Sequence, residues 1–98
     1  MKIPGLPERM PEYREILPLK IGGKKGCARA GDIVFYTDEP EALFVLVTTE
    51  ESAGKKSVLA YDLKQHRLAS VEITGETEKV SVLGHIWNER LRRRFGIQ

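Results

Sequence analysis

The chain has 98 residues, the length of a single domain, with 41% hydrophobic residues and a formal net charge of +2. This composition excludes a disordered chain, and no apolar run approaches the roughly 20 residues that a membrane-spanning helix needs. The N-terminal residues lack the apolar stretch of a secretory signal, and the single cysteine, Cys27, cannot form an internal disulfide. We therefore expect one cytoplasmic domain with no membrane partner.

The charges are unevenly distributed along the chain. Residues 1–30 carry seven basic and three acidic side chains, residues 31–80 carry five basic and ten acidic ones, and residues 81–98 carry four basic and one acidic. Contacts with anions are therefore expected to come from the two basic ends. The alternative is that the ends only neutralise the acidic middle of the chain.

The first thirty residues are interrupted by prolines at positions 4, 7, 11 and 18, which predicts an irregular N-terminal strap that covers a sheet edge. Pro11 suits the first position of a helix. That helix must end near Leu17, because Pro18 disfavours helical backbone at the residue before it. The glycine-rich residues 22–26 predict a turn.

A β rhythm follows, made of five short apolar runs separated by turn residues: 33–36, 43–47, 58–63, 68–73 and 80–87. This spacing is typical of a small antiparallel barrel, SH3-like or related, over residues 31–87. The first two runs are apolar at every position, so we expect these strands to be covered on both faces. Gly84 in the last run predicts a bulge or a bend.

The last segment, residues 88–98, predicts a short basic helix. Asn88 is a favourable N-cap, and Gly96 favours the end of the helix. Trp87, Leu91 and Phe95 are four residues apart, so they would form one apolar stripe against the barrel.

Residues with catalytic or metal-binding chemistry are sparse. His66 and His85 have no partners at metal-ligand spacing, and Cys27 does not complete a zinc set, so we predict no metal and no cofactor. Lys24 and Lys25 would activate a nearby thiol, but a cysteine beside a strand more often packs as a small hydrophobic residue. The chain has no recognised catalytic motif, and we predict no catalytic residue.

Two short motifs, Gly31-Asp32-Ile33-Val34 and Val82-Leu83-Gly84-His85-Ile86, resemble the β-domain of signal peptidases and LexA-type self-cleaving repressors. In that family a serine motif shortly precedes the Gly-Asp turn, whereas residues 21–27 here contain no serine. Lys55 and Lys56 fall in an expected loop rather than in the strand that holds the family's general-base lysine. The resemblance therefore implies at most an inactive, degenerate peptidase-like domain.

The basic ends of the chain supply the candidate binding residues: Arg90, Arg92, Arg93 and Arg94 in the helix, with Lys24, Lys25 and Arg29 in the strap. Guanidinium groups grip phosphates and carboxylates, and an exposed Trp87, Tyr36 or Phe95 would stack on a base. We predict a single non-catalytic binding domain for nucleic acid or an acidic protein surface. The alternatives are a protein–protein adaptor, or an oligomer subunit that pairs through an edge strand.

Overall fold

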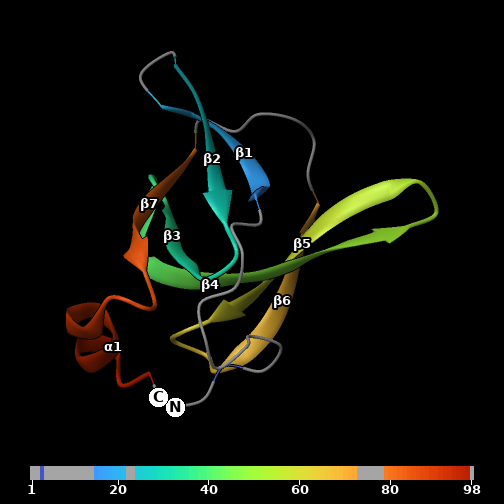
Figure 1. The fold of residues 1–98 in the computed structure, drawn as a ribbon. Helices are drawn as coiled ribbons and strands as arrows, with labels where there is room; N and C mark the ends of the chain where they lie inside the picture. Colours follow the sequence, from blue (N-terminus) through green and yellow to red (C-terminus); the bar gives the residue numbers. More distant parts are fainter. Residues whose placement is uncertain (1–2, 4–14, 22–23, 73–78, 98) are drawn as a thin grey trace.

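The computed structural model describes residues 3, 15–21, 24–72 and 79–97, which form seven strands and one helix (Figure 1). Five antiparallel strands make one sheet in the order β6-β5-β4-β3-β7, and β1 and β2 pair in a separate two-stranded ribbon. The elements are β1 Glu15–Ile21, β2 Lys24–Arg29, β3 Asp32–Tyr36, β4 Glu39–Ser52, β5 Lys55–Asp62, β6 Arg67–Glu72, β7 Val80–His85 and α1 Glu89–Phe95.

The predicted β rhythm is confirmed, since each of the five apolar runs overlaps one strand of the five-stranded sheet. The runs 58–63 and 80–87 extend past the ends of β5 and β7, and residue 73 of the run 68–73 lies outside the described part of the chain. The second strand is longer than predicted, because β4 continues through polar residues into a hairpin with β5 that projects from the sheet (Figure 1). Among the described residues no pairing joins β6 to β7, the two outer strands. Closure of the sheet into a barrel therefore stays a prediction.

The prediction of an irregular strap is wrong for residues 15–29, which form the β1–β2 ribbon, and a helix that reaches Leu17 is excluded. Leu17 and Leu19 are two positions apart, so on a strand they share a face, and Leu19 is buried against the main sheet. Pro18 pairs with Cys27 in this ribbon, where each strand is an edge that tolerates a missing N–H. The other residues of the predicted helix, 11–14, lie outside the described part of the chain.

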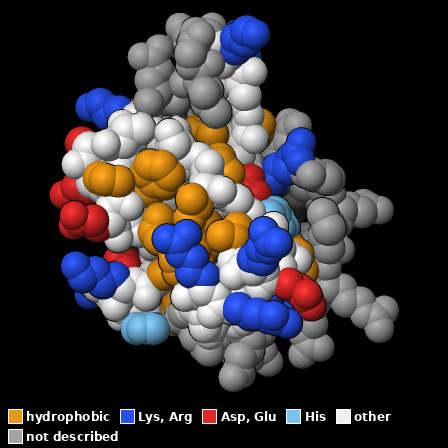
Figure 2. Space-filling model, turned by 90° about the vertical axis from the view of Figure 1, so that its left-hand side faces the viewer, with side chains coloured by type: hydrophobic (Ala, Val, Ile, Leu, Met, Phe, Trp, Pro, Cys, Tyr) orange, Lys and Arg blue, Asp and Glu red, His pale blue; other side chains and the backbone are white. Residues whose placement is uncertain are grey.

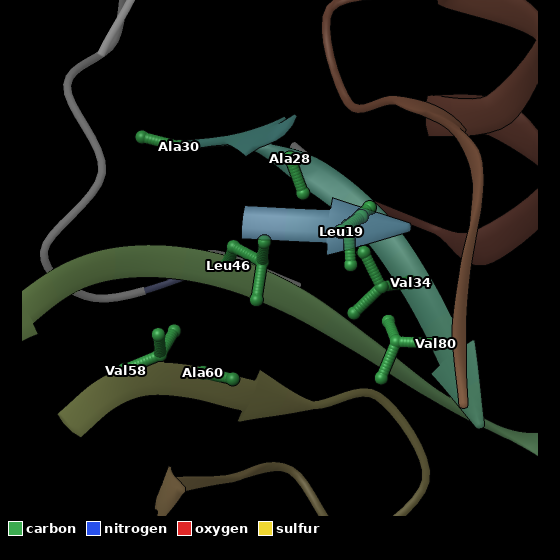
Figure 3. Close-up of a cluster of buried hydrophobic side chains, with 8 residues drawn as sticks. All are labelled: Leu19, Ala28, Ala30, Val34, Leu46, Val58, Ala60 and Val80. Carbon is green, nitrogen blue, oxygen red and sulfur yellow. The ribbon is translucent and has the colours of Figure 1, made fainter. Parts of the chain in front are cut away.

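The β1–β2 ribbon covers one face of the sheet. Figure 3 shows the ribbon-side cluster, in which side chains from the β1–β2 ribbon and from Ala30, just after it, meet side chains of β3, β4, β5 and β7. Its buried members are Leu19, Ala28, Ala30, Val34, Leu46, Val58, Ala60 and Val80. Because alternate residues of a strand point to opposite faces, the neighbours of these residues face the other side of the sheet.

The opposite face of the sheet packs against α1. The buried members of this helix-side cluster are Ile3, Ile33, Val45, Val47, Tyr61, Ile86 and Ile97. Trp87, Leu91 and Phe95 pack against it, which confirms the predicted apolar stripe. The sheet is thus the middle of three layers, and the expectation that its first two strands are covered on both faces is confirmed.

The predicted irregularity at Gly84 is a bulge in β7. Ile33 pairs with Gly84 while Val34 pairs with Val82, which leaves Leu83 as the extra residue. A Cβ at Gly84 would collide with Cδ1 of Leu91, so glycine allows α1 to lie directly on β7.

Candidate nucleic-acid interface

Both ends of helix α1 are fixed by local hydrogen bonds. Asn88 has extended backbone angles, and its Oδ1 accepts hydrogen bonds from the N–H groups of Arg90 at 3.0 Å and Leu91 at 3.4 Å. At the other end Gly96 is left-handed with φ of 64°, and the N–H of Ile97 donates to the carbonyl of Arg92 at 2.9 Å. These caps hold a helix of only seven residues that would be marginal alone.

Three of the four arginines of α1 are exposed, on the part of the helix surface that its apolar residues leave free. Leu91 and Phe95 are half-buried against the helix-side cluster. Residues advance by about 100° per position around a helix, so Arg90, Arg93 and Arg94 fall within roughly one third of its circumference. All three are exposed, whereas Arg92 is half-buried.

Figure 2 shows the face of the molecule that includes α1, with Lys and Arg side chains gathered in its lower half beside hydrophobic side chains. The guanidinium carbon of Arg94 lies 5.5 Å from the centre of the Phe95 ring, within cation–π range. The apolar anchoring and this contact restrict the helix and one of its arginines. The exposed arginines are therefore carried by a fixed helix rather than by a loose tail.

The other predicted basic residues are not part of this surface. Lys24 and Lys25 are exposed at the start of β2, at the tip of the β1–β2 ribbon, which lies at the opposite end of the molecule from α1 in Figure 1. Arg29 is half-buried at the end of β2, and its backbone N–H donates to Oδ2 of Asp32 at 2.8 Å. The ribbon and α1 cover opposite faces of the sheet, so the seven candidates divide into two groups.

Sequence reasoning missed a polar and aromatic cluster where β3 pairs with β7. Asp32 is only 8% exposed and is the register partner of His85. Nε2 of His85 lies 3.2 Å from the carbonyl oxygen of Ala30 and 3.8 Å from Oδ1 of Asp32, and the backbone N–H of Trp87 donates to Nδ1 of His85 at 3.3 Å. Because Nδ1 accepts, this network assigns the imidazole proton to Nε2, which donates to Ala30.

Both ring nitrogens of His85 are therefore engaged by neighbouring backbone groups. Trp87 stacks on the imidazole, with ring centres 4.3 Å apart and an interplanar angle of 27°. Gly31 lies beneath them with φ of +88°, and a Cβ there would collide with Cζ3 of Trp87. Gly31 and Asp32 belong to the first of the two motifs noted in the sequence, and His85 belongs to the second. The pairing of β3 with β7 brings these motifs together.

Two further candidates for chemistry, Cys27 and His66, lie on other elements of the fold. Cys27 is half-buried, with Sγ 3.5 Å from the carbonyl oxygen of Ala28. His66 is exposed in the turn before β6. In the described part of the chain no three His, Cys, Asp or Glu residues are grouped so that they would hold a metal ion.

Comparisons with protein families, curated proteins and solved structures gave no match to this chain. Within the described part of the chain, no helix is both long enough and apolar enough to cross a membrane.

Proposed function

We propose that this protein is a non-catalytic domain that binds nucleic acid through the α1 surface, defined by Arg90, Arg93 and Arg94. The observation that carries the proposal is the exposure of these three guanidinium groups on one side of a capped and anchored helix. Arginine matches phosphate geometry with paired N–H donors, and a fixed helix loses less entropy when it binds than a flexible tail does. Arg92, at the border of this surface, adds a fourth positive charge.

The recognised group is phosphate rather than the base. Trp87 and Phe95 are half-buried, Trp87 is stacked on His85, and Tyr36 packs edge-on against Phe44 with ring centres 6.0 Å apart. None of these rings is an open platform on which a base would stack. Binding through phosphates alone positions a protein without reading sequence, so we expect similar affinity for unrelated sequences.

Fluorescence anisotropy with a labelled 20-base-pair DNA duplex at 50 mM salt tests this proposal. Replacing Arg90, Arg93 and Arg94 together by Ala should abolish measurable binding, because essentially all non-specific affinity comes from phosphate neutralisation. The matched control replaces Lys24 and Lys25 by Ala, two exposed cations at the far end of the molecule, and should change the affinity by less than the arginine variant does. Equal losses in the two variants would refute an interface centred on α1.

A second candidate function, a protein–protein adaptor or oligomer subunit, is favoured by the edges of the sheet. The outer strands β6 and β7 each carry a leucine that is 41% exposed, Leu68 and Leu83. An outer strand presents backbone groups that pair with another chain. Light scattering on the purified protein tests the oligomer version, and a strict monomer at millimolar concentration would contradict it.

The degenerate peptidase-like alternative has weaker support. Its two motifs are neighbours in the sheet, but Lys55 begins β5 as an exposed residue and no serine precedes the Gly-Asp turn. For a version that uses Cys27, thiol labelling of the native protein at the rate of a model peptide or slower would exclude an activated nucleophile. A closed SH3-like barrel, binding to an acidic protein surface and a cytoplasmic location stay predictions.

A further inference from the structure

The three exposed arginines of α1 lie in two neighbouring rows along the helix. Residues four positions apart lie one above the other, so Arg90 and Arg94 share one row. Arg93 belongs to the next row, in which the exposed Glu89 precedes it by four residues. Because each residue advances by about 100° around the axis, Arg93 and Arg94 leave the helix in different directions. The α1 surface therefore has two sides, one with two cations and one with a single cation.

The neighbours of these arginines differ between the two rows. The guanidinium carbon of Arg94 lies 5.5 Å from the centre of the Phe95 ring, and Phe95 leaves the helix on the side of Arg94 that is away from Arg93. An arginine that stacks through its flat face keeps the N–H groups at its edge for a phosphate. In the other row, the carboxylate of Glu89 repels phosphate. A nucleic-acid backbone that follows this second row therefore meets one favourable contact, at Arg93.

A single strand has one backbone and follows one row at a time. Along the row of Arg90 and Arg94 it would meet two guanidinium groups. A DNA duplex instead presents two backbones on either side of a groove, and the major groove is about 12 Å wide, close to the diameter of about 10–12 Å of a helix with its side chains. In Figure 1, α1 lies at the margin of the molecule with no other described element outside it. A duplex thus offers phosphates to both sides of the α1 surface at once.

The aromatic rings at the two ends of α1 do not compensate a single strand for the lost phosphate contact. Trp87 stacks on His85 with ring centres 4.3 Å apart. Phe95 carries the guanidinium group of Arg94 and packs against the helix-side cluster. Proteins that bind single strands gain much of their affinity from bases that stack on open rings. Here both rings are already in contact with other groups.

We propose that the α1 surface binds double-stranded DNA at the major groove, with Arg90 and Arg94 on the phosphates of one strand and Arg93 on a phosphate of the other. This inference rests on the proposed function and adds which form of nucleic acid the surface takes and which strand each arginine contacts. The duplex is B-form DNA, because the major groove of an RNA duplex is deep and narrow. A single strand contacts only the row of Arg90 and Arg94.

Salt titrations of fluorescence anisotropy test this arrangement with a 20-base-pair DNA duplex and with a 20-residue oligo-dT strand. Each phosphate contact contributes about −0.9 to the logarithmic salt slope on duplex DNA and about −0.7 on a single strand. Three contacts on the duplex and two on the strand predict slopes of about −2.7 and −1.4. Between 50 and 200 mM salt, the affinity should therefore fall about 40-fold for the duplex and about 7-fold for the strand.

Single substitutions then distinguish the two rows. Arg93→Ala should reduce the magnitude of the duplex slope by about 0.9 and leave the slope for the single strand at about −1.4. Arg90→Ala is the matched variant in the other row and should reduce both slopes, whereas Lys24→Ala, at the far end of the molecule, should alter neither. An effect of Arg93→Ala on both nucleic acids, or on neither, would overturn the two-strand arrangement while phosphate binding by α1 stands. Slopes that no arginine variant alters would overturn the proposed function as well.

Discussion

The packing of Trp87 over Gly31 makes the stability of this domain sensitive to a single methyl group. Gly31 has φ of +88°, where an L-residue is strained, and the added Cβ of Gly31→Ala would collide with Cζ3 of Trp87, approach its Cη2 to 2.9 Å and lie 3.0 Å from Cε1 of His85. The left-handed backbone costs about 1–2 kcal/mol, and forcing an extra carbon into packed surroundings costs about 1–3 kcal/mol. We expect Gly31→Ala to lower the free energy of unfolding by about 2–5 kcal/mol.

Urea denaturation followed by far-ultraviolet circular dichroism measures this loss directly, with a signal that does not depend on Trp87, the only tryptophan. Gly26→Ala is the matched control, because that glycine has ordinary backbone angles and nothing within 4 Å of the added Cβ. Gly31→Ala in a Trp87→Leu background should cost less than in the wild type, since the ring that collides is gone and mainly the backbone strain remains. Equal stability of Gly31→Ala and Gly26→Ala would refute the packing described for this cluster.

Three further substitutions test local features by the same denaturation assay. Asn88→Ala removes the cap of α1 and should cost about 1 kcal/mol, and an unchanged midpoint would contradict the capping role. Ala53→Asn should stabilise the β4–β5 hairpin by up to about 1 kcal/mol, because Ala53 has φ of 53° before Gly54 and asparagine is preferred there; a loss of stability would count against this turn geometry. Gly84→Ala should cost about 1–3 kcal/mol by pushing against Leu91, and it should cost less when it is introduced into a Leu91→Ala background; an equal cost in both backgrounds would contradict this contact.

Local signals in the sequence predicted most of the strands and the helix. The five apolar runs are bounded by turn residues, and α1 carries its cap at Asn88 and its stop at Gly96, so neighbouring residues determine where these elements lie. The β1–β2 ribbon escapes prediction because its local signal is short: the two-residue spacing of Leu17 and Leu19 stands among prolines, which are typical of irregular segments. Pro18 is compatible with a two-stranded ribbon, in which each strand has a free side.

The arrangement of the candidate residues could not be predicted in the same way, because it depends on contacts between distant segments. Asp32 and His85 meet only because β3 pairs with β7, across more than fifty residues of chain. Likewise, the separation of Lys24 and Lys25 from the arginines depends on which face of the sheet the ribbon covers. Charge counts along the chain identify the two basic segments. They do not indicate that these segments lie at different ends of the molecule.

The salt dependence of DNA binding tests the central claim most directly. If Arg90, Arg93 and Arg94 each neutralise one phosphate, the logarithm of the association constant should fall with the logarithm of the salt concentration with a slope of about −2.7, which is about a 40-fold loss of affinity between 50 and 200 mM. Replacing one of the three by Ala should reduce the magnitude of the slope by about one, and Lys24→Ala should leave it unchanged. A slope that none of the arginine substitutions alters would contradict a phosphate-binding surface on α1.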